Sequence, residues 1–252
     1  ILVWGLTYEV GIQVVYFVYH LERVPETGRL RFIDVSVDSE RQAGEETFQQ
    51  IIHQYKGHIL PSHHPLTKYV VNVAERILEA TSLGHVKGHN TLSSSTDLVD
   101  DVWRPDGDRL SSPVSNDEWE VYVIDDDTRN AFVLPGGKIF VFTGILPSCK
   151  NEDGLASVLG HEIAHQVARH SGERMSSTKV IFFLVTLLEL LGLDVGVSRI
   201  GLTLLLTLPN SRTQEAEADS IGLKLMSKAC FDPAEATRQD FHPYSSSSPK
   251  IF

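Results

Sequence analysis

The pattern that most constrains this chain is His161-Glu162-Ile163-Ala164-His165. Two histidines at positions i and i+4 lie on one face of an α-helix, one turn apart, so both imidazoles can reach a single ion. Glu162 is then placed to act on a water molecule beside the ion instead of binding it. The rest of this helix is apolar, with Leu155, Val158, Leu159, Ile163 and Val167. Histidines on a core helix need polar partners, which favours a metal site over a surface helix with two solvated histidines.

A catalytic zinc site takes three protein ligands, so a third is expected on another helix. The segment from Ser211 to Met226 supplies three acidic residues. Glu215 and Asp219 are four residues apart and share a helical face, whereas Glu217 points elsewhere. The spacing favours Glu215 as the third ligand of one Zn²⁺ per chain, with Asp219 accepting the free N–H of a ligating histidine. The alternative is an ordinary charged helix start.

Two cysteines and a formal net charge of −11 narrow the function classes. Cys149 and Cys230 do not form a Cys-x-x-Cys pair, which excludes a thiolate zinc site, and both are expected to be free thiols. A nucleic-acid-binding protein would need a basic surface, so nucleic acid is not expected as a partner.

The coarse secondary-structure pattern predicts a mainly helical α+β fold with a small β-hairpin or sheet. Helical periodicity covers residues 38–80 around a loop at 58–65, and polar residues 81–116 are expected to form a long surface loop. Short strands are predicted at 119–124, 131–134 and 138–142, the last two joined by a Pro135-Gly136-Gly137 turn. Further helices are predicted from Asn151 to about Ser171 and from about Thr213 to Lys228.

Two long apolar stretches indicate contact with a membrane. Residues 1–20 are long enough for a membrane anchor, although their β-branched content also fits a buried strand. Arg23, Arg29 and Arg31 would form its basic flank. Residues 180–208 contain central charges and two glycines, which favours a helical hairpin lying against the membrane or a partner over a single span. The chain begins with Ile1, so we expect its start to be missing.

Three motifs in the same order resemble the M48 family of zinc metalloendopeptidases. They are NAFVLPGGKIFVFTGIL at 130–146, HEIAHxxxxH at 161–170 and SRxxEAEADxxGLxLM at 211–226, and the likeness runs from about Trp119 to Asp232. The apolar N-terminus followed by VPETGRLRF is also similar to the membrane anchor and junction of fungal members.

The resemblance implies a zincin-like metalloprotease core with roles for particular residues. His161, His165 and Glu215 would hold zinc, Glu162 would be the general base, and Asp219 would be the hydrogen-bond partner of a ligand. His170 matches the family pattern, and a capping, packing or substrate-contact role is open. The hairpin would offer an edge strand for an extended peptide, with Phe132, Val133 and Leu134. The implied organisation is a helical part at 21–117, a peptidase core at 118–240 and a disordered tail at 241–252.

The implied function is membrane-associated hydrolysis of peptide bonds in membrane or misfolded proteins, in mitochondrial protein quality control at the inner membrane. The expected partners are a protein or peptide substrate and membrane lipid, and a homo-oligomer is left open. Family members carry a Ser-Thr-His-Pro-Ser motif near the C-terminus, where this chain has Asp240-Phe241-His242-Pro243-Tyr244. We therefore expect the C-terminus to be incomplete, and the alternative function is a catalytically inactive, membrane-anchored zinc-fold scaffold or binding protein.

Overall fold

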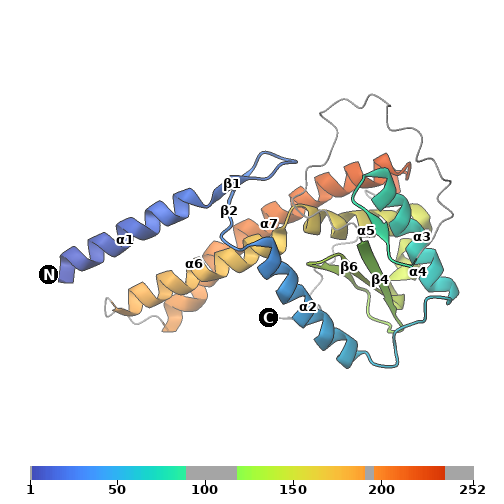
Figure 1. The fold of residues 1–252 in the computed structure, drawn as a ribbon, viewed down its shortest axis with the longest axis horizontal. Coiled ribbons are helices and arrows are strands. Elements are labelled where there is room, and N and C mark those ends of the chain that lie inside the picture. The colour runs from blue at the N-terminus through green and yellow to red at the C-terminus, as the bar shows by residue number, and fades with distance from the viewer. Residues whose placement is uncertain (1, 89–117, 191–195, 236–252) are drawn as a thin grey trace.

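The computed structural model describes residues 2–88, 118–190 and 196–235, and it is mainly helical with two small sheets (Figure 1). The helices are α1 (Leu2–Tyr19), α2 (Val37–Gln54), α3 (Pro65–Ala80), α4 (Leu146–Cys149), α5 (Glu152–Val167), α6 (His170–Leu190) and α7 (Gly196–Lys228), with a 3₁₀ turn η1 at Thr143–Ile145. The strands are β1 (Leu21–Arg23), β2 (Leu30–Phe32), β3 (His85–Val86), β4 (Glu118–Ile124), β5 (Ala131–Leu134) and β6 (Lys138–Phe142). The predicted α+β class is confirmed.

The larger sheet has the strand order β3-β4-β6-β5. Strands β4 and β6 are parallel, and β5 pairs antiparallel with β6 through the predicted hairpin. The three-residue loop Pro135-Gly136-Gly137 joins these strands, and Gly136 and Gly137 both have positive φ values, 100° and 77°, a region that glycine adopts at no steric cost. Strand β3 pairs in parallel with β4 and was not predicted, because two residues carry no readable periodicity.

Both faces of this sheet are covered, because the side chains of strand β6 enter a different apolar core on each face. Ile139 and Val141 point into a core shared with α3, α5 and α7. Phe140 and Phe142 point to the opposite face, where they pack with Ile51 and neighbouring residues of α2. The strand is therefore apolar along its whole length, since alternate side chains enter different cores.

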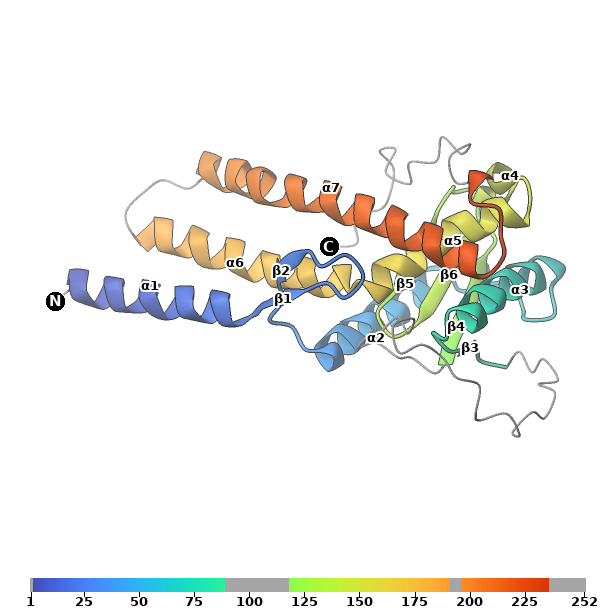
Figure 2. The same ribbon diagram turned by 90° about the horizontal axis from the view of Figure 1, so that it is seen from above.

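Helices α6 and α7 form an antiparallel hairpin that joins the two predicted ligand helices (Figure 2). The expectation that residues 180–208 form two helical pieces is confirmed for the described residues, and both arms return to the same side. Their extents differ from the prediction, because α7 begins at Gly196 instead of near Thr213. The two pieces are thus the end of α6 and the beginning of α7, and they do not form a separate insert.

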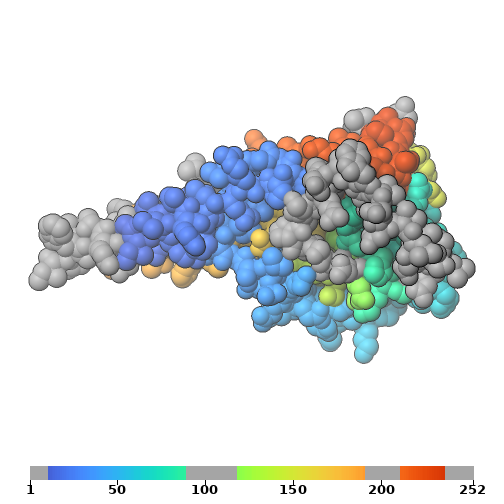
Figure 3. All heavy atoms as spheres, turned by 45° about the horizontal axis from the view of Figure 1, so that its top comes forward, coloured from blue at the N-terminus to red at the C-terminus, as the bar shows by residue number. Residues whose placement is uncertain are grey.

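The N-terminal segment begins as a helix, so the buried-strand alternative for residues 1–20 is wrong. Within the described residues, no helix combines the length and the apolar character needed to cross a membrane. Beyond α1 the chain forms the unpredicted β1–β2 hairpin, and in Figure 3 this blue segment lies over α6. Arg31 is buried there against the α5–α6 junction, a different environment from the expected membrane flank.

The helix predicted from Asn151 to Ser171 is interrupted, which corrects the sequence-based expectation. Helix α5 ends at Val167, Arg169 has a left-handed φ of 53°, and α6 begins at His170. The side chain of Arg169 donates to the Val35 carbonyl at 2.9 Å and to the Glu40 carboxylate. Contacts from a segment more than 120 residues away hold the break, so local periodicity could not reveal it.

Some expectations fall outside the described residues. They are the tail at 241–252, the His242-Pro243 segment and most of the predicted loop at 81–116.

Candidate metal centre

Helix α5 is fixed at both its start and its middle. Asn151 caps it, accepting the Gly154 N–H at 2.8 Å, as predicted. Farther along, Gly160 lies against Gly222 of α7, and a Cβ on Gly222 would meet the His161 backbone nitrogen at 2.9 Å. Two glycines thus let the helices cross in backbone contact, which brings α7 within reach of the histidine side chains.

The structure brings together the three residues expected to bind metal. One donor atom from each of His161, His165 and Glu215 lies within 4.8 Å of the others. The His161 and His165 Nε2 atoms are 3.1 Å apart, and Glu215 Oε2 lies 3.4 Å from the first and 3.8 Å from the second. Ligand atoms about 2.0–2.2 Å from a tetrahedral zinc ion would be about 3.4 Å from one another. The donor set therefore fits zinc.

The carboxylate of Glu215 is a second sign that the group fits a cation. Its Oε1 atom is buried and has no hydrogen-bond partner among the described residues. Burial would raise the pKa of Glu215, but the neighbouring His161 and His165 side chains outweigh burial and lower it to about 2. An ionised carboxylate with an unpartnered buried oxygen is costly unless a cation compensates it.

The surroundings shift the pKa values of the two histidines in opposite directions. Burial lowers the pKa of His165 to about 4, despite the neighbouring Glu215 carboxylate. Burial also opposes protonation of His161, but the nearby Glu215, Glu162 and Asp219 outweigh it and raise the pKa. The carboxylates around His161 thus favour positive charge at this position.

Glu162 follows His161 in the chain and is not one of the three donor residues. Burial raises its pKa to about 7, with Glu215 adding to the rise and His161 and Arg174 opposing it. A carboxyl group with a pKa near the working pH can both accept and release a proton, as a general acid–base catalyst must.

The other two acidic residues of the α7 motif face different partners. Asp219 contacts His161 Nδ1 at 2.9 Å, the kind of contact the sequence predicted for it. Glu217 is turned away from the three donor atoms and contacts His170 Nε2 at 3.1 Å. Burial would raise the pKa of Glu217, but hydrogen bonds from His170, Arg29 and Thr27 lower it to about 2.

Sequence reasoning missed most of the polar residues behind His165. His170 was noticed but given no definite role, because position i+5 lies about 140° around a regular helix from i. The break at Arg169 turns it back, so that His170 Nδ1 lies 2.8 Å from His165 Nδ1. Arg29 was expected in the basic flank of a membrane anchor, but it contacts Glu217, 188 residues away, because the β1–β2 hairpin brings the two together.

The expected substrate-binding strand lies beside the ligand helix. Strand β5, with Phe132, Val133 and Leu134, is the last strand of its sheet and packs against α5. No other strand in the described part of the chain pairs with its outer edge.

Comparisons with known proteins agree with this chemistry. The family model described as peptidase family M48 matches residues 108–250. The chain is 44% identical over 223 residues to the mitochondrial metalloendopeptidase OMA1 of Schizosaccharomyces pombe, covering 88% of this chain and 57% of that protein. It is 38% identical to the protein of the same name from Saccharomyces cerevisiae, covering 90% and 60%. The human metalloendopeptidase OMA1, mitochondrial, is 30% identical, covering 87% and 39%. The chain thus spans little more than half the length of these two yeast relatives.

Proposed function

Because this chain belongs to peptidase family M48, we propose that it is a zinc-dependent endopeptidase acting in mitochondrial protein quality control. The observation that carries the proposal is the convergence of His161, His165 and Glu215 around the unpartnered Glu215 oxygen. We propose these three as ligands of one zinc ion, Glu162 as general base, and Asp219 as the group that orients His161. The same geometry supports a zincin-like catalytic core.

The protein side chains have separate tasks in this reaction. Bound zinc would supply a Lewis acid that lowers the pKa of water and polarises the peptide carbonyl. The Glu162 carboxylate takes a proton from the attacking water and then gives it to the nitrogen of the leaving amine. The two steps leave Glu162 as it began, which suits a group whose pKa burial raises to about 7.

An extended segment of a protein substrate is proposed to bind along strand β5. Main-chain hydrogen bonds to its outer edge would align the peptide without selecting a side-chain sequence. Because β5 packs on α5, a peptide added there runs past the helix that carries Glu162. Recognition through the main chain suits unfolded stretches of many proteins, in agreement with a role on membrane or misfolded substrates.

Location at the mitochondrial inner membrane is proposed from two observations. The relatives named above are mitochondrial proteins, and the described part of α1 exposes large apolar side chains, among them Val14, Val15, Val18 and Tyr19. An apolar surface of this kind favours contact with lipid. Flotation with phosphatidylcholine vesicles should fall when Val15 and Val18 are changed to Asp. The matched change Leu66→Asp, at an exposed position on α3, should leave flotation unchanged.

The catalytic proposal is tested by pairing metal analysis with cleavage. The purified protein should contain about one zinc per chain and should hydrolyse an unfolded protein substrate. A chelator should abolish cleavage, and added zinc should restore it. Stoichiometric zinc without cleavage would favour the inactive scaffold, and no zinc at all would reject both functions.

A further inference from the structure

A continuous row of polar contacts leads away from His165 on the side opposite the proposed ion. His165 Nδ1 lies 2.8 Å from His170 Nδ1, and His170 Nε2 lies 3.1 Å from Glu217 Oε2. The side chains of His170 and Glu217 are only 1% and 3% exposed. Water is thus largely excluded, and each group must satisfy its neighbour.

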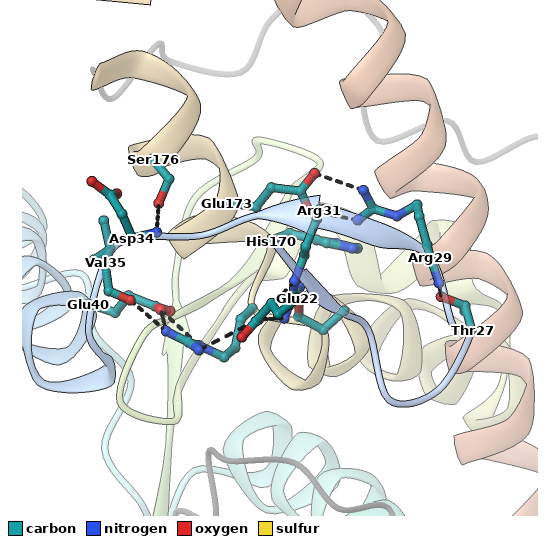
Figure 4. A network of polar contacts seen from close by, with 12 residues as sticks. Glu22, Thr27, Arg29, Arg31, Asp34, Val35, Glu40, His170, Glu173 and Ser176 are labelled. Atoms are coloured by element: carbon teal, nitrogen blue, oxygen red, sulfur yellow. Dashed lines mark hydrogen bonds and ion pairs between the residues drawn. The ribbon is translucent and has the colours of Figure 1, made fainter. Parts of the chain in front are cut away.

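The far end of the row is a buried ion-pair cluster. Arg29, on the N-terminal hairpin, donates to Glu217 Oε2 from Nε at 3.0 Å and from Nη2 at 2.7 Å. It also forms a two-bond contact with Glu173 of α6, at 2.8 and 2.6 Å (Figure 4). The Thr27 hydroxyl donates to the other Glu217 oxygen. A carboxylate that receives charged and neutral donors on both oxygens is held in its ionised, accepting form.

The charge on Glu217 fixes the protons along the row. An ionised carboxylate can only accept, so the imidazole tautomer of His170 that fits the 3.1 Å contact with Glu217 carries its proton on Nε2. The Nδ1 atom of His170 is then an acceptor, and His165 must donate to it from Nδ1. The lone pair of His165 therefore remains on Nε2, the atom that faces His161 and Glu215.

We infer that His170 and Glu217 are positioning residues that set the tautomer and ring orientation of His165, and that Arg29 of the N-terminal hairpin completes this device. The inference rests on the proposed function in one respect, the assignment of His165 as a zinc ligand. His161 has a simpler arrangement, since Asp219 contacts its Nδ1 directly. Both histidines thus present Nε2 to the ion, one backed by a carboxylate and the other by a histidine–carboxylate pair.

The segment after the hairpin also determines where His170 lies. Arg31 donates to the Ala168 carbonyl, and Arg169 is held by Val35 and Glu40. These contacts surround Arg169, the left-handed residue between α5 and α6. Residues 29–40 lie outside the family match at 108–250, yet they hold both the charge behind His170 and the turn that places it.

The test compares two buried carboxylates that share Arg29. Glu217→Gln removes the charge behind His170, whereas Glu173→Gln removes the other partner of Arg29 and leaves the row to His165 intact. Zinc affinity of the metal-free protein is measured by competition with a chromophoric chelator. We expect Glu217→Gln to weaken zinc binding by about 10- to 100-fold and Glu173→Gln to leave it within about threefold. Equal affinities in Glu217→Gln and wild type, or equal losses in both variants, would overturn the inference.

A spectroscopic measurement separates positioning from a general loss of stability. Long-range ¹H–¹⁵N spectra of histidine-labelled, metal-free protein report which ring nitrogen carries the proton. The His165 proton should be on Nδ1 in wild type and Glu173→Gln, and should be distributed over both nitrogens in Glu217→Gln. An unchanged His165 tautomer in a folded Glu217→Gln variant would contradict the proposed device.

A milder pair of variants keeps the test decisive if Glu217→Gln does not fold. Arg29 is partly exposed on a surface hairpin, so its replacement is better tolerated. Arg29→Lys keeps the charge beside Glu217 and should retain zinc affinity, while Arg29→Gln should weaken it. Equal affinity in these two variants would contradict the role of Arg29. If wild type itself binds no zinc, the proposed function fails, and that outcome is distinct from a failure of the inference.

Discussion

Each of the two histidines on α5 has a supporting carboxylate on the side away from the proposed ion, and these two supports, Asp219 and Glu217, lie in opposite surroundings. Asp219 contacts His161 directly, and its side chain is 65% exposed. Glu217 acts on His165 only through His170, and its side chain is 3% exposed. Water competes for the hydrogen bond of Asp219 and screens its charge, whereas Glu217 depends on protein donors alone. The two ligands therefore have matching roles at the ion but depend unequally on the fold behind them.

The difference follows from the geometry of one helix. Positions 217 and 219 of α7 are two residues apart, which separates their side chains by about 200° around the helix. One carboxylate can thus face the solvent side of α5 while the other faces the α5–α6 junction. The exposed support lies within α5 and α7, whereas the buried support recruits the β1–β2 hairpin. The buried side consequently ties the N-terminal part of the chain to the metal centre.

The largest expected effect is a loss of catalysis in a variant that keeps both supporting carboxylates. Glu162 is not among the three donor residues, and Asp219 and Glu217 bond to His161 and His170 instead of to Glu162, so Glu162→Gln should leave zinc affinity close to that of wild type. Gln keeps the shape of the side chain but cannot accept a proton near pH 7, so the rate of peptide hydrolysis should fall by about 10²- to 10⁴-fold. Zinc content and cleavage are measured on the same preparation. Near-normal turnover would remove Glu162 from the mechanism.

A second, smaller effect compares the two supports directly by stability. Glu217→Gln leaves Arg29 short of a buried partner, and we expect it to lower the free energy of unfolding by about 2–4 kcal/mol, somewhat below the usual cost of breaking a buried pair because Glu173 remains. Asp219→Asn removes an exposed charge and should cost less than about 1 kcal/mol. Urea unfolding of the metal-free proteins measures both values. Equal losses would mean that burial does not distinguish the two supports.

The sequence predicted the exposed half of this arrangement and missed the buried half, for a physical reason. His161, His165, Glu215 and Asp219 follow the i, i+4 spacing of regular helices, so periodicity alone suggests that they share faces. The contact between His165 and His170 needs a helix break that Arg31, Val35 and Glu40 impose from far away in the chain. Local patterns carry no information on such contacts.

The same contrast holds for the fold. The hairpin at 131–142 was predicted, because two short apolar strands flank a glycine turn and the pairing between them is local. The β1–β2 hairpin was not predicted, since its strands have three residues each. The lengths of α6 and α7 were also missed, because the apolar stretch had been treated as an insert separate from the ligand helices.

A third prediction tests whether the exposed support depends on the close crossing of α5 and α7. In Gly222→Ala the added Cβ would lie 2.9 Å from the His161 nitrogen, where backbone atoms cannot yield cheaply. We expect a loss of about 1–3 kcal/mol in unfolding free energy, together with weaker zinc binding as α7 moves away from His161. Gly11→Ala, in a helix with open space around the position, is the matched control and should not lower the unfolding free energy. A neutral result at Gly222 would show that the crossing tolerates separation.

The smallest expected effect is on cysteine labelling when zinc is removed, since the fold around the two supporting carboxylates should stay closed. Cys149 lies in the main apolar core with Ile145 and Leu155, and burial raises the pKa of its thiol to about 11. Cys230 is exposed, and neither cysteine is in a disulfide. Because thiolate is the reactive form, iodoacetamide at pH 7.5 should label only Cys230 in the native protein.

Labelling can therefore show whether the core opens when the metal is removed. Cys149 packs in the apolar core, away from the three ligand side chains. A chelator should therefore leave the number of labelled cysteines at one per chain. Urea should raise it to two, and Cys230→Ser should reduce the native value to zero. A second label after chelation would mean that the ion, and not the two carboxylate supports, holds α5 and α7 together, and the comparison between an exposed and a buried support would then apply only to the metal-bound protein.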